Sequence, residues 1–407
     1  MSETGSNINP RRTHFVFAVY VYLILFCLFI PVGFFPFQQE ITDFVFKNLL
    51  VFLSETVFRL QLADPQISSD STLLYILATL LLPVSVVVTL LLSFLSGKNI
   101  AKEKIIDLLF MLLLLHLSWS MFNYGANKIF KLQFYSPEPN ILYTPFGKLD
   151  KDILYWSTIG TSYSYSLFLG LAEVIAGSLL LFKRLRRVGL LLCFFLSVNI
   201  FAINLCFDIS VKLYSGFLLL ASVVMILHEK GFLTGSQRCK LVNHSAPDWS
   251  FTKPYVKHFI HLAFVSLIFI IYFLPAIRSG YLNQDETPRH PLSGAYTVTN
   301  MITSDSTRMA QHIKNIFIHR QNFLIFQSDN DAMQDYKLLI DESEKKFILT
   351  DYDLRQTEFN YQYSAADSTL TLAHLKAGHE FTLVARALNW QKLPALQNSF
   401  HFTMDQP

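Results

Sequence analysis

Three strongly polar side chains interrupt long apolar stretches of the sequence: His116, Glu173 and Asn199. At a helical rise of 1.5 Å per residue, each lies about 15 to 16 Å from the start of its stretch. That depth is near the middle of a hydrocarbon core about 30 Å thick. A polar group there is costly unless it has a partner or faces a cavity. We therefore predict one buried cluster of the three, with Glu173 either neutral or held by His116.

This cluster is suited to binding the polar head of an otherwise apolar ligand, or to relaying a proton. The alternative is a structural network that fixes the register of the helices. No familiar catalytic signature accompanies it, since HExxH, P-loop, GxSxG and Rossmann patterns are all absent from the sequence. Catalytic residues and cofactor-binding residues therefore remain unassigned.

A second polar set is expected at the outer rim of the membrane. Asn204, Asp208 and Lys212 follow one another at intervals of four residues. This set could form the mouth of a cleft for an anion or a quinone-like head group. The alternative is an interfacial salt bridge between Asp208 and Lys212, with ordinary lysine and tyrosine anchors around it. The full predicted set is Tyr124, Lys128, Asn204, Asp208, Lys212 and Tyr214.

Two of the apolar stretches carry a one-sided pattern with spacings of four, three and four residues, which marks one face of a helix. In the first, the face is polar: His116, Ser120, Asn123 and Asn127. In the second, small residues flank a carboxylate: Ser166, Gly170, Glu173 and Gly177. Small residues predict that a neighbouring helix packs closely there.

The composition indicates a membrane protein: hydrophobic residues make up 52% of the 407 residues, and charged residues 15%. A net charge of +3 gives no indication of a nucleic-acid partner. The four cysteines have no paired spacing, so we predict neither a disulfide frame nor a metal site. The expected partners are the lipid bilayer and a redox partner subunit.

We predict about seven membrane spans, preceded by a short polar N-terminus. The segment Ile41–Leu60 is interpreted as an amphipathic helix on the membrane surface, with a further span as the alternative. The predicted spans are Phe15–Phe35, Leu73–Leu95, Ile105–Tyr124, Tyr163–Phe182, Val188–Phe207, Val211–Leu227 and Phe259–Ile277.

Orientation follows from the distribution of lysine and arginine. With a cytoplasmic N-terminus, fourteen of these cations fall in inner segments and seven in the longer outer loops of the membrane part. We therefore expect a multi-pass protein of the bacterial inner (plasma) membrane. Its N-terminus would be cytoplasmic and its C-terminal domain periplasmic or extracytoplasmic.

The last 120 residues lack an apolar run long enough to span a membrane, and they alternate as short strands do. We predict an antiparallel all-β barrel or sandwich. The expected strands are Gly294–Ile302, Asn315–Arg320, Asn322–Gln327, Tyr336–Ile340, Lys346–Thr350, Phe359–Tyr363, Thr369–His374 and Glu380–Arg386.

The block His116–Leu227 resembles DoxX-like membrane proteins, of the long type found in Bacteroidetes and related bacteria. The resemblance rests on YGANKIFKLQF at 124–134, GLAEVIAGSLLLFKRLRRVG at 170–189 and NIFAINLCFDISVKLYSGFLLL at 199–220. It implies a four-helix core made of the third to sixth spans. Because the family takes its name from a subunit of a quinone-linked thiosulfate oxidoreductase, the resemblance also favours a quinone. The family's glycine- and acid-rich pattern before the second span is replaced here by Ser68–Thr72, and the role of that loop stays unassigned.

These expectations divide the chain into four parts. Residues 1–104 hold the signal-anchor span, the interfacial helix and the second span, and 105–230 form the DoxX-like core. A cytoplasmic loop, the seventh span and a linker occupy 231–287, and 288–407 form the β domain. The expected function is binding of a quinone or other lipophilic molecule as part of a redox complex. A proton-coupled transporter of small solutes using Glu173, and a non-catalytic scaffold whose β domain binds a lipid or partner, remain alternatives.

Overall fold

The computed structural model describes residues 10–33, 35–62, 65–96, 99–229, 254–303, 312–376 and 379–397. Most of the loop predicted after the sixth span, Gly231–Lys257, lies outside the described residues, and its last four residues belong to a helix. Residues 1–9 also lie outside the described residues. The chain separates into two compact units. Unit 1 comprises 1–130 and 167–282, and unit 2 comprises 131–166 and 283–407.

This division differs from the predicted one, because residues 131–166 join the β domain although they lie within the predicted four-helix core. The sequence of Lys131–Ser157, which contains three prolines, predicts a loop, but the structure forms α5 (Pro139–Leu142) and α6 (Lys151–Gly160) there. The physical reason is a set of charged contacts between the segment and the chain around the first two strands, described below.

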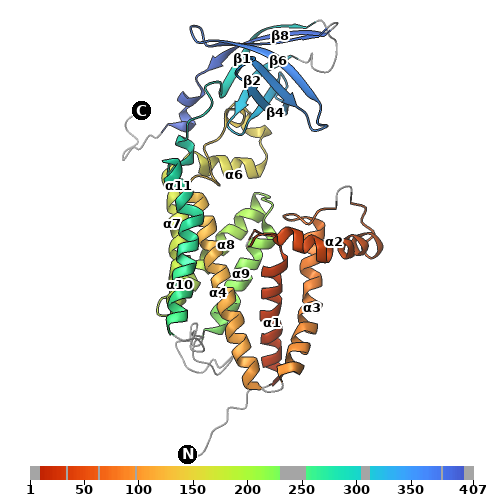
Figure 1. Cartoon of the computed structure of the whole chain (residues 1–407), viewed down its shortest axis with the longest axis vertical. Coiled ribbons are helices and arrows are strands. Elements are labelled where there is room, and N and C mark those ends of the chain that lie inside the picture. Colours follow the sequence, from red (N-terminus) through yellow and green to blue (C-terminus); the bar gives the residue numbers. More distant parts are fainter. Residues whose placement is uncertain are drawn as a thin grey trace, which may run out of the picture. The chain divides into compact units, whose positions relative to one another are not determined.

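The regular structure of unit 1, within the described residues, is helical (Figure 1). Its helices are α1 (Pro10–Phe29), α2 (Gln38–Thr56), α3 (Thr72–Ser96), α4 (Asn99–Ile129), α7 (Tyr163–Leu181), α8 (Arg186–Cys206), α9 (Lys212–His228), α10 (Pro254–Ile268) and α11 (Leu274–Ser279). A single π-helical turn, Phe269–Phe273, joins α10 to α11.

Five helical segments of the described chain are long and apolar enough to cross a membrane. They are Thr72–Phe94, Ile105–Ile129, Tyr163–Leu181, Arg186–Cys206 and Leu262–Glu286. The first and sixth predicted spans correspond to shorter apolar helices, His14–Phe29 and Lys212–His228, so the count of seven is not confirmed. The helix α2 is not among the five, so the alternative of a further span there gains no support.

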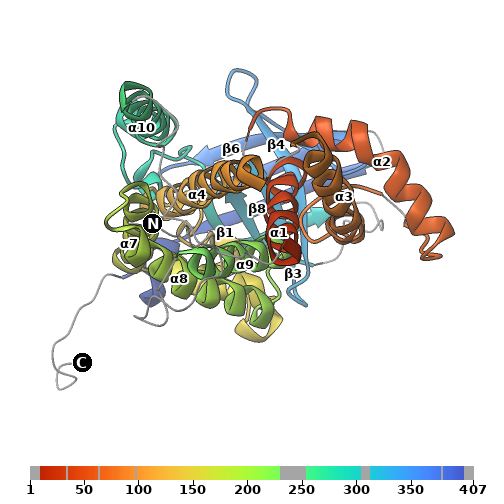
Figure 2. The ribbon, with the colours of Figure 1, turned by 90° about the horizontal axis from the view of Figure 1, so that it is seen from below.

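The core of unit 1 is centred on α1, which packs against α3 and α4. Phe26 of α1 stacks on Phe217 of α9 with ring centroids 4.1 Å apart, and Figure 2 shows α1 with α3 on one side and α9 on the other. The predicted four-helix core is therefore not a separate bundle. Apolar side chains such as Leu90 and Phe94 of α3 remain exposed, as a lipid-facing surface requires.

Unit 2 contains a closed antiparallel barrel in which each strand pairs with the next and β1 pairs with β8. All eight predicted strands are confirmed, and the barrel rather than the sandwich is the outcome. The strands are β1 (Gly294–Thr303), β2 (Ile313–His319), β3 (Phe323–Ser328), β4 (Met333–Asp341), β5 (Lys346–Thr350), β6 (Gln356–Ser364), β7 (Thr369–Lys376) and β8 (His379–Leu388).

Apolar side chains fill the interior of the barrel. Phe347, Leu370, Leu372 and Leu383 have no exposed surface, and Phe359 is buried among them. This packing follows the alternation of inward and outward residues along each strand. Closure also leaves no sheet edge open to pairing with another chain.

Candidate functional site in the helical unit

Two helices of unit 1, α4 and α7, approach closely at glycines. A Cβ atom added at Gly170 would lie 2.6 Å from the carbonyl oxygen of Gly125, and one added at Gly125 would lie 2.7 Å from that of Gly170. Further along, the Ser118 hydroxyl donates to the carbonyl oxygen of Gly177 at 2.9 Å. The predicted close packing on the small-residue face of α7 is therefore confirmed, and the neighbour is α4.

This crossing brings Glu173 of α7 against Lys128 of α4. The Lys128 Nζ lies 2.8 Å from both carboxylate oxygens of Glu173. The two side chains are only 7% and 3% exposed. The Lys128 ammonium also lies 5.6 Å from the ring centroid of Tyr124, within cation–π range. The result is a buried ion pair with an aromatic ring beside it.

This pairing corrects two predictions. The cation that holds Glu173 is Lys128 and not His116, and Lys128 is buried in the unit instead of standing at an exposed rim. Lysine near a helix end is commonly an interface anchor, but here its ammonium is buried against a carboxylate.

His116 lies in a second group of hydrogen bonds. The Tyr214 hydroxyl is 2.7 Å from the Ser120 hydroxyl and 3.1 Å from His116 Nε2. All three residues are buried. Tyr214 was predicted at the outer rim, and the structure instead places it with His116. The rings of Tyr124 and Tyr214 lie 6.3 Å apart, so the two groups are neighbours.

Asn199 does not join either group, so the predicted cluster of three is wrong. Asn199 is exposed on α8, whereas the buried face of that helix carries Cys193, Ser197 and Asn204. At 3.6 residues per turn, Asn199 points away from that face. Position along an apolar stretch predicts depth in a membrane, but it does not predict which way a side chain faces.

The remaining rim residues form local structure around the turn from α8 to α9. Asn204 donates to the Ser215 hydroxyl at 3.0 Å. Asp208, whose side chain is exposed, lies 2.7 Å from the Lys212 ammonium four residues later. This geometry matches the alternative of a salt bridge at a helix end.

Asp70, in the loop that had no assigned role, caps α9. Its carboxylate oxygens accept from the backbone N–H groups of Lys212 and Leu213 at 2.7 and 3.0 Å. Acceptors at a helix start satisfy N–H groups that have no partner within the helix. The loop before α3 therefore ties that helix to α9.

A second buried ion pair was not predicted. The Arg186 guanidinium, at the start of α8, lies 3.7 Å from Glu229, which directly follows α9. Both side chains are 3% exposed. Arg186 also lies 5.8 Å from the ring centroid of Phe110. In the sequence, Arg186 had been interpreted only as a marker of orientation, and nothing near Glu229 indicates this partner.

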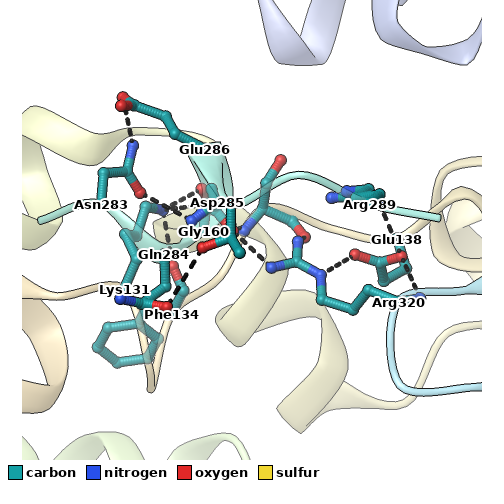
Figure 3. Close-up of polar contacts among 12 residues, drawn as sticks. Lys131, Phe134, Glu138, Gly160, Asn283, Gln284, Asp285, Glu286, Arg289 and Arg320 are labelled. Atoms are coloured by element: carbon teal, nitrogen blue, oxygen red, sulfur yellow. Dashed lines mark hydrogen bonds and ion pairs between the residues drawn. The ribbon is translucent and has the colours of Figure 1, made fainter. Parts of the chain in front are cut away.

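In unit 2, a network of charges joins the segment 131–166 to the start of the barrel (Figure 3). Glu138, which is 1% exposed, pairs with Arg289 at 3.1 Å and with Arg320. Arg320 pairs with Asp285 at 2.8 Å, and the Lys131 ammonium lies 3.6 Å from the same carboxylate group. The Lys131 ammonium also donates to the backbone oxygens of Phe134 and Gly160.

Burial shifts the pKa values of these groups in different directions. It lowers the pKa of Lys131, against the opposing effect of the Asp285 carboxylate. Burial by itself would lower the pKa of Arg320, but the Glu138 and Asp285 carboxylates raise it above its ordinary value. The two carboxylates therefore favour the charged form of Arg320.

No cofactor is assigned by this geometry. Within the described ranges, no group of three or more His, Cys, Asp or Glu side chains is placed to hold a metal ion.

Unit 1 contains a run of hydrogen-bond donors and acceptors inside an apolar helical core. They are Lys128, Glu173, Tyr124, Tyr214 and His116. We call these five residues the intramembrane polar group.

Comparison with known proteins gives one informative relative. No family model matches the chain, and no solved structure matches it. Over 116 residues the chain is 34% identical to the uncharacterized protein YwoB of Bacillus subtilis (strain 168), a stretch that is 28% of this chain and 73% of that protein. On this identity and coverage, the chain belongs to the same family as the uncharacterized protein YwoB.

Proposed function

We propose that the helical unit binds a lipophilic molecule with a polar head, most simply a quinone, at the intramembrane polar group. The observation that carries this proposal is the Lys128–Glu173 ion pair, held at 2.8 Å inside an apolar unit. A charge pair is expensive to remove from water, and apolar side chains of similar volume could pack two helices at least as well. Ionisable groups within a membrane span are therefore most often retained for function.

The chemistry of a quinone fits the donors in this group. A quinone ring carries two carbonyl oxygens, which accept hydrogen bonds from an ammonium, a phenol or an imidazole N–H. Lys128, Tyr124, Tyr214 and His116 supply these donors from two helices, α4 and α9. The tail of the quinone would lie among the exposed apolar side chains of the unit.

The wider assignment rests on the resemblance to DoxX-like proteins and on charge distribution. In this proposal the protein is a DoxX-like component of a redox complex in the bacterial inner membrane, and a partner subunit supplies or removes electrons. The N-terminus is cytoplasmic and the barrel extracytoplasmic, because the short clusters of lysine and arginine then all fall on the inner side.

Quinone analysis of the purified full-length protein tests the proposal. We expect a fixed ratio of quinone to protein after extraction, at least tenfold lower in Glu173→Gln. Glu55→Gln is the matched control, because Glu55 is exposed on α2. If Glu173→Gln does not fold, Tyr214→Phe removes one donor and keeps the ring.

Two results would count against the proposal. The first is equal quinone content in Glu173→Gln and Glu55→Gln. The second is the absence of quinone from the wild-type protein even after quinone is added back in nanodiscs. Proton-dependent solute uptake by vesicles, lost in Glu173→Gln, would favour the transporter instead. Lipid binding that resides in residues 288–407 would favour the scaffold.

A further inference from the structure

Unit 2 contains a pocket of about 290 Å³ that the proposed function does not use. Its walls come from three places in this unit: the segment before α5, the helices α5 and α6, and the end of β2. The residues that matter here are Gln133, Tyr135, Asn140, Asp152, Trp156 and His319. A volume near 300 Å³ is at the small end of the range for ligand pockets, and it is large enough for one sugar-sized ring.

Two side chains that line the pocket carry buried oxygens without hydrogen-bond partners in the described chain. Gln133 Oε1 and Asn140 Oδ1 are both buried, and neither has a hydrogen-bond partner among the residues that the structure describes. Both side chains line the same pocket. A buried acceptor that lacks its hydrogen bond destabilises the fold. Both oxygens have almost no accessible surface, so each amide must rotate about its last side-chain bond to turn its oxygen into the pocket, where a ligand hydroxyl can donate to it.

The other walls are aromatic and apolar. Trp156 and Tyr135 line the pocket together with Pro137, Ile141 and Ile153. The Trp156 ring packs against Phe134, with ring centroids 4.9 Å apart and the ring planes tilted by 53°. An aromatic ring in a pocket wall offers a surface against which the C–H groups of a ligand can pack.

The charges nearby argue against an ionic ligand. Glu138 has the buried carboxylate in the wall, and its two oxygens are already paired with Arg289 and Arg320. Arg320 lies 4.9 Å from the ring centroid of Tyr135, so it opposes a second cation at that ring. An anion would meet Asp152 and Glu138 in the wall. Because burial lowers the pKa of His319, its imidazole is neutral at neutral pH.

From these four features we propose that this pocket binds a neutral polyhydroxylated ring, such as a single sugar residue. Hydroxyl groups of the ring donate to Gln133 and Asn140, and its C–H face packs on Trp156. The ring can belong to a free saccharide or to the headgroup of a glycolipid, since the chemistry that recognises it is the same.

The test uses the full-length protein in phosphatidylcholine nanodiscs, which contain no sugar. Methyl β-glucoside, methyl β-galactoside and glycerol serve as probes, and binding is followed by saturation-transfer NMR and tryptophan fluorescence. We expect saturable binding of at least one glycoside, weakened at least tenfold by Gln133→Leu, Asn140→Leu or Trp156→Ala. Gln391→Leu is the matched control, because Gln391 is exposed and outside the pocket.

Competition identifies the source of the ring. If nanodiscs that contain a glucosyl diacylglycerol abolish glycoside binding, the natural ligand is a lipid headgroup, and unchanged binding indicates a free saccharide. Either result supports the site. The proposal is overturned if no glycoside binds, or if tetramethylammonium or inorganic phosphate binds instead. It is also overturned if all three pocket variants are shown by thermal unfolding to be folded and still bind glycoside as the wild type does.

Discussion

Removing one member of the Lys128–Glu173 pair should destabilise unit 1 far more than removing both. The substitution Glu173→Gln leaves the Lys128 ammonium in a position where its side chain is 7% exposed and has lost a partner at 2.8 Å. The double substitution Lys128→Met with Glu173→Leu removes both charges and keeps similar volumes. The comparison separates the cost of an unpaired charge from the net contribution of the pair.

The expected magnitudes follow from burial. Breaking a buried pair by removing one partner costs about 3 to 5 kcal/mol, whereas replacing both with apolar residues is about neutral or stabilising. For a unit of this size, each kcal/mol lost from the free energy of unfolding lowers the thermal unfolding midpoint by about 2 to 4 °C. Glu173→Gln should therefore lower that midpoint by roughly 6 to 20 °C. The double variant should unfold within a few degrees of the wild type.

The assay is thermal unfolding of each variant in one detergent, followed by tryptophan fluorescence and by the loss of monodisperse protein. Glu55→Gln serves as the exposed control. If Glu173→Gln unfolds at the same temperature as this control, the pair is not buried as described. If the double variant is as unstable as the single one, the pair contributes through its own attraction, and the case for retention by function weakens.

Three further predictions concern the cap, the helix crossing and a titrating histidine. Asp70→Ala removes both acceptors at the start of α9 and should cost about 1 to 2 kcal/mol, while Asp70→Asn should lose clearly less; equal losses would show that the cap contributes little. Gly170→Ala places a methyl group 2.6 Å from a carbonyl oxygen of α4 and should cost about 1 to 3 kcal/mol, whereas Gly147→Ala, which meets nothing within 4 Å, should cost far less. Burial lowers the pKa of His319 from its ordinary value of 6.5, so the unfolded chain takes up the proton first as the pH falls. Stability should therefore be constant above about pH 6.5 and decline below it. The His319→Gln variant should show a smaller decline in unfolding midpoint between about pH 8 and pH 5, and an identical pH profile would refute the assignment.

The barrel could be predicted from the sequence because apolar and polar residues alternate along each strand. In β6, Phe359 and Tyr361 are buried while Asn360 between them is exposed, which is the alternation that the sequence displays. In a barrel with neighbouring strands in sequence order, local pattern and overall topology agree. The turns between strands then leave few alternative pairings.

The intramembrane polar group could be predicted only in part. Glu173 and His116 stood out because charge and polarity are rare in apolar runs, and both are buried. Their partners depend on which faces of α4, α7 and α9 meet, and that choice is made by tertiary packing. The close approach of α4 and α7 at their glycines places Lys128 against Glu173. The rotation of α8 about its axis points Asn199 away from both.

The connecting segment could not be assigned for a different reason. Glu138 and Arg320 are 182 positions apart, and nothing local to either residue indicates the other. Loop composition with several prolines is equally compatible with an unstructured linker. Only the folded unit shows that this acidic residue is the one that two arginines share.

The distance in sequence between Glu138 and Arg320 also has a consequence for synthesis. The chain that separates them includes α7, α8, α9 and α10, so all of these helices leave the ribosome before Arg320 does. At about 5 to 20 residues per second, Glu138 waits roughly 10 to 40 s for that partner. During most of this interval Glu138 has neither of its arginine partners, and Lys131 has not yet met Asp285. Unit 2 can thus be completed only after the intervening helices have been synthesised. In a chain that stalls among those helices, the segment 131–166 would be open to proteases.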